Sequence, residues 1–304
     1  MPYNVKSIKS LAKLLDVDVE ELVRIEQNPE KYYEPFEKKR GEKSRSIDNP
    51  TGELAALQIR IKKFLLCDVD VFRPIATGGV KGHSTKTSAL LHTNKDCVAT
   101  VDVKSFFPCV TNNKVYKVFC NLGYSPPVSR MLTRITTYKG HLPQGSATST
   151  IIANLALYNF DEYLYNQSLR LGCDCIRFVD DIIISGSYGK VTELVSLVFP
   201  ALHRMRFSVH RAKKLKIMKS NKRQEVLGLT VNRAVGVTKS YVEEVRTQIA
   251  CVEKCSVTSC VYLKLVGKIQ YIGTTKPIIA GNLMRKLRNS LMRPEKECLA
   301  SIEQ

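Results

Sequence analysis

The sequence predicts an α+β fold, in which an antiparallel sheet carries acidic residues and a helical, basic region follows it. An apolar strand at 97–103 has an aspartate near its end, and an apolar hairpin at 176–185 holds two adjacent aspartates at its turn. Apolar residues recur at helical spacing in the segments between and around these strands. Beyond a last hairpin ending near Val237, a helical pattern and a surplus of basic residues continue to about Leu291.

The elements before the first strand follow from apolar spacing and turn residues. Apolar residues recur at helical spacing over 7–15, and Asp18 begins a second short helix. These two helices form a predicted N-terminal extension at 1–30. An extended hairpin at 31–50 and an amphipathic helix at 52–66 complete this part of the chain.

Four further helices are predicted around the two acidic segments. The third of them begins near Ser146, which we expect to cap it through its hydroxyl group. The fourth precedes a hairpin whose strands lie at 226–231 and 234–237. The predicted helical ranges are 112–122, 126–137, 146–158 and 191–206.

The formal charge is the strongest bulk signal, because this chain of 304 residues carries +19 at pH 7. Residues 201–304 hold 21 Lys and Arg against 7 Asp and Glu, a surplus of 14. Such a chain attracts a polyanion, because each neutralised phosphate releases condensed counterions. A solvated basic surface or an anionic lipid partner would leave the acidic motifs unexplained. The basic loop 77–84 lacks the Gly-Lys-Ser/Thr ending of a P-loop, which excludes that nucleotide site.

No apolar run approaches the ~18 residues that a membrane span requires. Residues 1–6 lack the apolar stretch of a secretory signal, so we expect a cytoplasmic protein without a membrane partner. Its ten cysteines would stay reduced there. They form no Cys-x-x-Cys pair, and the cluster at 251–260 lacks the spacing and the fourth ligand of a zinc site.

The acidic residues suit metal-dependent phosphoryl transfer. Asp102 and the pair Asp180-Asp181 lie on separate apolar segments that could converge. Phosphoryl transfer from a triphosphate uses carboxylates that hold two Mg²⁺ ions roughly 3.5–4 Å apart. One or two carboxylates per ion suffice, because Mg²⁺ keeps water and takes substrate phosphates as further ligands. In a strongly basic chain, this pattern predicts a template-directed nucleic-acid polymerase.

Three stretches resemble the motifs of one enzyme family in their order and separation, namely 101–108, 142–149 and 178–181. On these residues the chain resembles a reverse transcriptase, and most of all the compact bacterial retron type. The resemblance covers roughly residues 40–290. It implies a right-hand polymerase architecture, with fingers, a palm built of an antiparallel sheet plus helices, and a helical basic thumb.

The resemblance also implies how the chain is divided. Residues 31–232 would form the fingers and palm, with the fingers inserted around 31–95 and 112–145. Residues 233–304 would form the thumb and bind RNA.

In the family's terms, Asp102, Asp180 and Asp181, with Val103 beside them, would hold two Mg²⁺ ions, for which Mn²⁺ could substitute. The resemblance implies that the three aspartates are catalytic.

The resemblance assigns the incoming nucleotide to a second set of residues, namely Lys43, Arg45, Phe107, Gln144 and Gly145. The two basic residues would contact the triphosphate, and the glutamine and glycine would position the nucleotide. The phenylalanine stands where a bulky side chain clashes with a ribose 2′-hydroxyl, so deoxynucleotides would be preferred. It or its predecessor is expected to belong to the core, because neighbours on a strand face opposite ways.

A third set would act on the leaving group, primer and RNA. Lys213, or the lysine after it, would protonate or neutralise pyrophosphate, or simply contact a phosphate. Phe178, Gly228, Leu229 and His92 would contact the primer or RNA. Two departures stand out: Phe178 replaces the family's usual Tyr, and a Leu precedes Gly228 where retron enzymes carry Thr.

The predicted function is therefore that of a retron's RNA-directed DNA polymerase, which uses deoxynucleoside triphosphates. A structured noncoding RNA would serve as template and primer, and the product would be a short single-stranded DNA joined to it (msDNA). The resemblance further implies antiviral defence with an accessory effector protein. The alternatives are another defence-associated or intron-type bacterial reverse transcriptase, or a catalytically silent RNA-binding module. A two-carboxylate glycosidase would leave the +19 charge unexplained.

Overall fold

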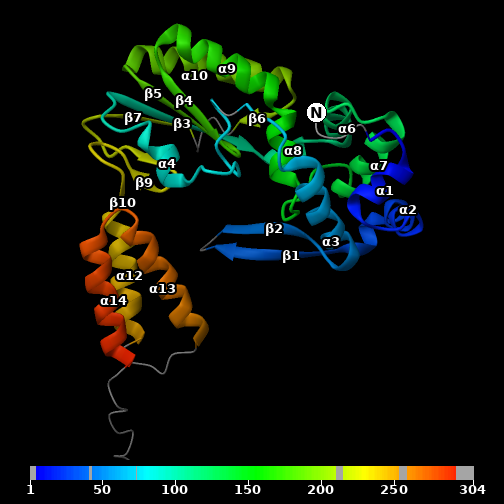
Figure 1. The fold of residues 1–304 in the computed structure, drawn as a ribbon. Helices are drawn as coiled ribbons and strands as arrows, with labels where there is room; N and C mark the ends of the chain where they lie inside the picture. The colour runs from blue at the N-terminus through cyan, green and yellow to red at the C-terminus, as the bar shows by residue number, and fades with distance from the viewer. Residues whose placement is uncertain (1–4, 41–42, 73, 210–214, 253–258, 292–304) are drawn as a thin grey trace, which may run out of the picture. The chain divides into compact units, whose positions relative to one another are not determined.

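The computed structural model describes residues 5–40, 43–72, 74–209, 215–252 and 259–291 (Figure 1). The chain divides into two units, and each is described by itself. The first joins residues 1–84 to 95–219, and the second joins residues 85–94 to 220–304.

The centre of the first unit is an antiparallel sheet. Its strands are β3 (Cys97–Lys104), β4 (Asp174–Phe178), β5 (Asp181–Gly186), β6 (Ser208–Val209) and β7 (Lys216–Lys219). β5 lies between β4 and β3, and the other edge of β3 pairs with β7 along its first half and with β6 at its end. Two helices, α9 (Tyr158–Leu171) and α10 (Tyr188–Arg204), lie across one face (Figure 1). The predicted α+β class, with its antiparallel sheet, is confirmed.

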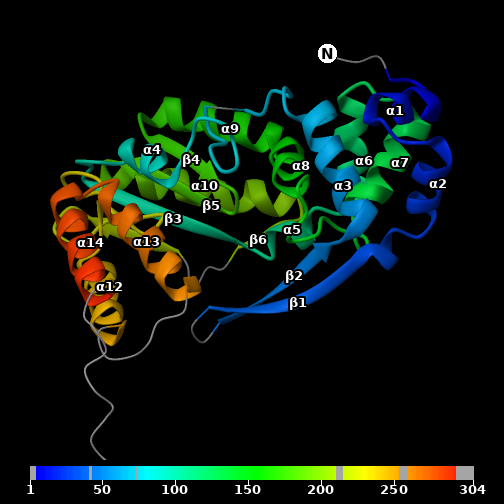
Figure 2. The ribbon, with the colours of Figure 1, turned by 60° about the horizontal axis from the view of Figure 1, so that its bottom comes forward.

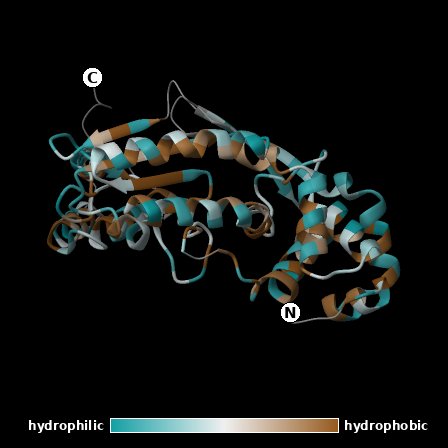
Figure 3. Cartoon of the chain, turned by 90° about the horizontal axis from the view of Figure 1, so that it is seen from above, coloured by the Kyte–Doolittle hydropathy of each residue, from teal (hydrophilic) through white to brown (hydrophobic). Residues whose placement is uncertain are grey.

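Side-chain alternation divides this sheet into two faces. Val101 and Val103 of β3, and Ile182 and Ile184 of β5, are buried in the apolar core. The intervening residues, among them Asp102, lie on the opposite face, because successive side chains of a strand point to opposite sides. The long helices carry both hydrophobic and hydrophilic residues (Figure 3), as expected where one side of a helix packs on a sheet.

The same core continues into helices that lie before β3 and between β3 and α9 in the sequence. These elements are α1 (Ile8–Leu15), α2 (Val19–Gln27), η1 (Pro29–Tyr32), α3 (Gly52–Ile61), η2 (Lys62–Leu66), α5 (Phe106–Cys109), α6 (Asn112–Asn121), α7 (Pro126–Thr136) and α8 (Ser149–Ala156). Leu11, Leu22, Leu57 and Leu132 are almost completely buried between them. The predicted N-terminal helices and the pair of helices after β3 are confirmed.

The predicted hairpin at 31–50 is also confirmed. β1 (Tyr33–Arg40) pairs with β2 (Lys43–Pro50) in continuous antiparallel register, and Figure 2 shows the pair as an extended ribbon.

Two helix predictions need correction. The helix predicted at 52–66 changes to a π-helical turn at η2. The helix predicted to start at Ser146 begins at Ser149, with Thr148 as its N-cap residue. The Ser146 hydroxyl instead donates to Gln58 Oε1 at 2.7 Å, and it accepts the Thr148 N–H. A separate helix, α9, follows, although the sequence pattern did not predict it.

The second unit contains a small sheet and a group of helices. Its elements are α4 (Thr85–Leu90), β8 (Glu225–Val226), β9 (Leu229–Thr230), β10 (Gly236–Val237), α12 (Lys239–Val252), α13 (Ser259–Gly273) and α14 (Pro277–Leu291). The predicted strand at 226–231 is wrong as a single element, because the chain turns back between β8 and β9. Leu227 and Gly228, with φ of +51° and +80°, occupy that two-residue turn.

The helices α12, α13 and α14 pack on one another through buried apolar residues, including Val245, Ile269, Leu283 and Leu287. None of the helices in the described ranges combines the length and the apolarity that a bilayer crossing requires.

Candidate active site

Two of the predicted catalytic carboxylates are cross-strand neighbours. Asp102 of β3 lies directly opposite Asp181 of β5 in the antiparallel register. Paired residues of adjacent strands project from the same face of a sheet. The preceding pair, Val101 and Ile182, points into the core. Asp102 and Asp181 therefore share the face away from α9 and α10, where both are partly exposed.

Asp180 lies in the turn between β4 and β5, and its backbone is fixed to β3. Its carbonyl oxygen accepts a hydrogen bond from the Val103 N–H at 3.0 Å. Val179 before it has φ of +60°, a left-handed conformation that costs an L-residue about 1–2 kcal/mol. Gly78 approaches the turn so closely that a Cβ there would lie 2.3 Å from Val179 N. The turn is thus held in a strained conformation against a glycine.

Two aromatic residues flank the carboxylates. Phe178 pairs with Asp181 across β4 and β5 and so lies on the same face as the carboxylates. Phe106 and Phe107 lie on α5, not on the strand as expected, and their rings meet edge to face at 5.4 Å. Phe106 is 4% exposed, whereas Phe107 is only partly buried. Phe106 is therefore the core residue of the two, and Phe107 keeps exposed surface.

The loop that contains Gln144 and Gly145 is attached to β2. The Gln144 carbonyl accepts the Asp48 N–H at 2.9 Å, and the Gln144 N–H donates to Asp48 Oδ2 at 3.2 Å. Gly145 has φ of +146°, and a Cβ there would lie 3.0 Å from the Asp48 carbonyl oxygen. The Leu142 N–H donates to the carbonyl of Val110, just after α5. These bonds place the loop between α5 and the strand that carries Arg45.

The remaining predicted site residues lie elsewhere. Arg45 is exposed on β2, opposite Lys38. His92 is buried in the second unit, where Gly228 lies in the β8–β9 turn and Leu229 is buried in β9. Two predictions fall outside the described residues, namely the side chain of Lys43 and all of Lys213.

The acidic face suits a metal ion that brings further ligands with it. Within the described ranges, no three His, Cys, Asp or Glu side chains are gathered closely enough to hold an ion on their own. Asp102 and Asp181 nevertheless lie side by side on one face of the sheet, and both are partly exposed. Mg²⁺ prefers oxygen ligands and needs only one or two carboxylates when phosphates and water complete its shell. The donor set therefore fits Mg²⁺ bound together with a triphosphate.

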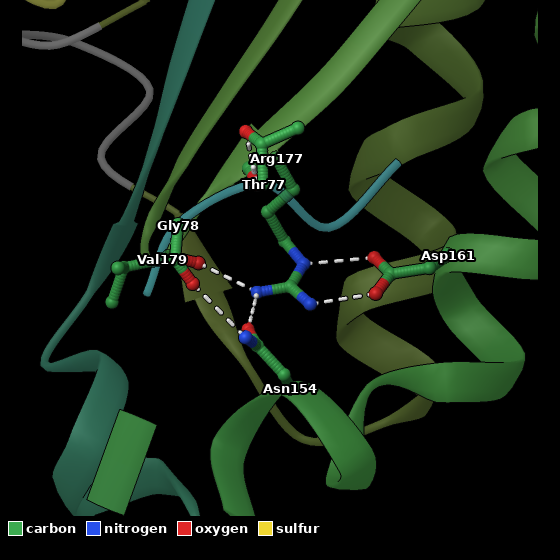
Figure 4. Close-up of polar contacts among 6 residues, drawn as sticks. All are labelled: Thr77, Gly78, Asn154, Asp161, Arg177 and Val179. Carbon is green, nitrogen blue, oxygen red and sulfur yellow. Dashed lines mark hydrogen bonds and ion pairs between the residues drawn. The ribbon is translucent and has the colours of Figure 1, made fainter. Parts of the chain in front are cut away.

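Sequence reasoning missed three polar residues behind the turn. Arg177 of β4 is fully buried, and it contacts Asp161 of α9, Asn154 of α8 and the Val179 carbonyl (Figure 4). Burial raises the pKa of Asp161, and the Arg177 guanidinium opposes this rise. A signal was present, because polar residues inside apolar segments need partners when buried.

Residues 37–231 match the model of the family described as "Reverse transcriptase (RNA-dependent DNA polymerase)". The chain belongs to this family. The matched range contains the acidic hairpin, Asp102 and the Gln144 loop.

Two curated relatives place this family member with the retron type. The Retron Se72 reverse transcriptase of Salmonella heidelberg is 31% identical over 216 residues, which cover 69% of this chain and 57% of the relative. The Retron Ec86 reverse transcriptase of Escherichia coli is 32% identical over 216 residues, which cover 70% and 67%. The chain thus spans about three fifths to two thirds of their lengths. The predicted resemblance to retron enzymes is confirmed.

A solved structure of telomerase from Candida albicans has the same fold. It aligns with a TM-score of 0.51 at 11% identity, covering 88% of this chain and 57% of that one. This likeness supports the polymerase fold alone.

Proposed function

We propose that the protein is a retron's RNA-directed DNA polymerase, which extends a primer hydroxyl with deoxynucleoside triphosphates. The observation that carries this proposal is the in-register pair Asp102–Asp181 beside the Asp180 turn, in a chain of the reverse transcriptase family. A template-copying site needs carboxylates that substrate can reach, and both aspartates are partly exposed on the face away from α9 and α10.

Asp102, Asp180 and Asp181, with Val103 beside them, would hold two Mg²⁺ ions, or Mn²⁺ in their place. The bound ions supply an activated attacking oxygen and stabilise the negative charge that develops in the reaction. The protein itself would hold the carboxylates in place. The fixed backbone of Asp180 and the in-register neighbours keep the carboxylates from moving apart, which matters because small displacements of reacting groups are costly.

The nucleotide would lie against the Gln144 loop. Gln144 is anchored to β2 at Asp48, so Arg45 of the same strand is suited to contact the triphosphate. In this proposal, Lys43 contacts the triphosphate as well. Phe107 would exclude a ribose 2′-hydroxyl with its exposed surface. In this proposal, Lys213 neutralises or protonates the departing pyrophosphate.

The RNA would be held by the second unit and by residues near the primer. Arg285, Lys286 and Arg288 are exposed on α14, which suits contacts to phosphates. We assign residues 233–304 to an RNA-binding thumb and residues 31–232 to the fingers and palm. Primer or RNA contacts would come from Phe178, Gly228, Leu229 and His92.

The proposed template and primer are one structured noncoding RNA, and the product is a short DNA joined to it (msDNA). Antiviral defence with an accessory effector protein belongs to the same proposal, and its support is the similarity to retron enzymes alone.

The decisive experiment replaces the turn aspartates. Asp180→Asn and Asp181→Asn should abolish DNA synthesis on an RNA template while RNA affinity stays at the wild-type level. Asp174→Asn is the matched control, because Asp174 lies on β4 in a surface ion pair with Lys95. Synthesis that survives in both turn variants would refute the assignment of the site.

A second experiment addresses the retron assignment. The protein is purified from cells that express its native locus, and the copurifying nucleic acid is analysed with and without RNase. A discrete short DNA joined to RNA is the expected result. RNA without such DNA, combined with activity on an added template and primer, would keep the polymerase and reject the retron.

A further inference from the structure

Arg177 is an unusual residue for its position, since it is a charged side chain within the apolar strand β4. Its side chain is 0% exposed. Arg177 pairs with Ile182 across β4 and β5, so it lies on the core face, opposite the carboxylates. It is the second-last residue of β4, which leads into the turn at Val179 and Asp180.

The guanidinium connects two helices to this turn (Figure 4). Its Nε donates to Asp161 Oδ1 at 2.8 Å and its Nη2 to Asp161 Oδ2 at 2.6 Å. Its Nη1 donates to Asn154 Oδ1 at 3.0 Å and to the Val179 carbonyl oxygen at 2.9 Å. The planar guanidinium binds both carboxylate oxygens of Asp161 through Nε and Nη2, which leaves Nη1 directed at the turn.

The backbone around Arg177 forms a second set of bonds to the loop that contains Gly78. The Arg177 carbonyl accepts the N–H groups of Thr77 at 2.9 Å and of Gly78 at 3.4 Å. Asn154 Nδ2 donates to the Gly78 carbonyl at 3.0 Å. Asn154 therefore links the guanidinium to the loop that touches Val179.

These contacts act on both sides of Asp180. The peptide that joins Val179 to Asp180 is held from the core side by Arg177, through the Val179 carbonyl. The next peptide, from Asp180 to Asp181, is held from β3 by the Val103 N–H. Val179 has a left-handed φ, which persists only where its surroundings enforce it.

We propose that Arg177 is a positioning residue of the polymerase site: fixed by Asp161 and Asn154, it holds the Val179–Asp180 peptide and so sets the carboxylates for metal binding. This inference rests on the proposed function. A buried ion pair is weak support for stability, because apolar residues of similar volume often replace it without loss. Holding the turn is a task that apolar residues cannot perform.

The test compares a double variant with the wild type. Arg177→Met/Asp161→Leu removes both charges together, so neither is left buried and unpaired. We expect it to fold and to bind RNA. We also expect the Mn²⁺ concentration for half-maximal binding, followed by the electron paramagnetic resonance signal of free Mn²⁺, to rise about tenfold or more. Turnover at saturating nucleotide should fall by a similar factor, since a lost charged hydrogen bond has an effect of this size.

Two readouts separate positioning from packing. Val198→Ala, in the buried part of α10, should lower the melting temperature and leave the Mn²⁺ affinity unchanged. The second readout is amide hydrogen exchange measured without metal. In the double variant, but not in Val198→Ala, exchange should become faster in the peptide that contains Val103 and in the peptide spanning Phe178–Asp181. If the double variant does not fold, Arg177→Lys serves in its place. Lysine keeps the positive charge beside Asp161, but its single ammonium group cannot bind both Asp161 oxygens and the Val179 carbonyl together.

Wild-type exchange and wild-type Mn²⁺ affinity in the folded variants would overturn the inference. The proposed function fails by a different result: a wild-type protein that binds Mn²⁺ but synthesises no DNA on any RNA template. In that case the exchange and Mn²⁺ measurements still decide what Arg177 does.

Discussion

Replacing Gly78 by alanine tests how closely the loop before α4 must approach the acidic turn. A Cβ at this position would lie 2.3 Å from Val179 N, 2.7 Å from Val179 Cγ2 and 2.8 Å from the Phe178 carbonyl carbon. Two of these three atoms are backbone, so no side-chain rotation relieves the overlap. The turn or the loop must move by roughly 1 Å to restore a normal contact.

Gly78→Ala should lower both stability and turnover strongly, although it adds a single methyl group. Overpacking of this kind costs about 3 kcal/mol, the upper part of the usual range. For a unit of this size, that lowers the melting temperature by roughly 6–12 °C. A displacement of about 1 Å at the turn would reduce turnover about 100-fold. Thermal unfolding and primer extension on an RNA template measure the two effects.

The matched control is Gly189→Ala, near the start of α10, where a Cβ would meet nothing within 4 Å. This variant should keep the wild-type rate and melt at the same temperature or slightly higher, because alanine favours a helix over glycine. If Gly78→Ala melted and turned over like the wild type, the close approach would have no functional consequence. A lower melting temperature with an unchanged rate would show that the turn position does not limit catalysis.

Three further predictions follow from the site and the charged surface. Phe107→Ala should raise ribonucleotide incorporation relative to deoxynucleotide incorporation, measured as the ratio of the two kcat/KM values; an unchanged ratio would contradict its role. Arg288→Gln should reduce the slope of log affinity for single-stranded RNA against log salt by about 0.7, measured by titration; an equal slope would place Arg288 off the RNA. In Arg177→Met, the pKa of Asp161, already raised by burial, should rise further, because the cation that opposes the rise is gone. The folded state then binds more protons than the unfolded one, so the free energy of unfolding should fall as pH rises above about 4, by up to ~1.4 kcal/mol per pH unit. Denaturant titrations at several pH values measure this free energy. A fall with pH no steeper than that of the wild type would refute the prediction.

The apolar runs around the aspartates made the central elements predictable. Ile182, Ile183 and Ile184 read directly as a buried strand, and Asp102 at the end of its own strand indicated where the two could meet. Register was not predictable, because it depends on which residues pair across strands, and a slip by one would move Asp102 to the core face. The structure pairs Asp102 with Asp181 and so places both on the face away from α9 and α10, where they are partly exposed.

Other features had no sequence pattern to announce them. The break between α8 and α9 falls at Leu157, an ordinary apolar residue, so the helical spacing runs through it. The left-handed φ of Val179 is contrary to the preference of a β-branched residue. For Val179, the close approach of Gly78, far away in the sequence, accompanies this conformation, and local propensity does not encode such an approach.

The two faces of the sheet explain why sequence motifs revealed only half of the site. Asp180 and Asp181 stand out because adjacent carboxylates in an apolar hairpin need an explanation. Arg177, three residues earlier, points the other way and finds its partner on α9, 16 residues back along the chain. A motif captures side chains that face the substrate together, whereas the group that holds them belongs to the core and is paired by tertiary structure. The carboxylate face and the Arg177 network meet at one peptide, between Val179 and Asp180, and we propose that the buried arginine positions the carboxylates from there.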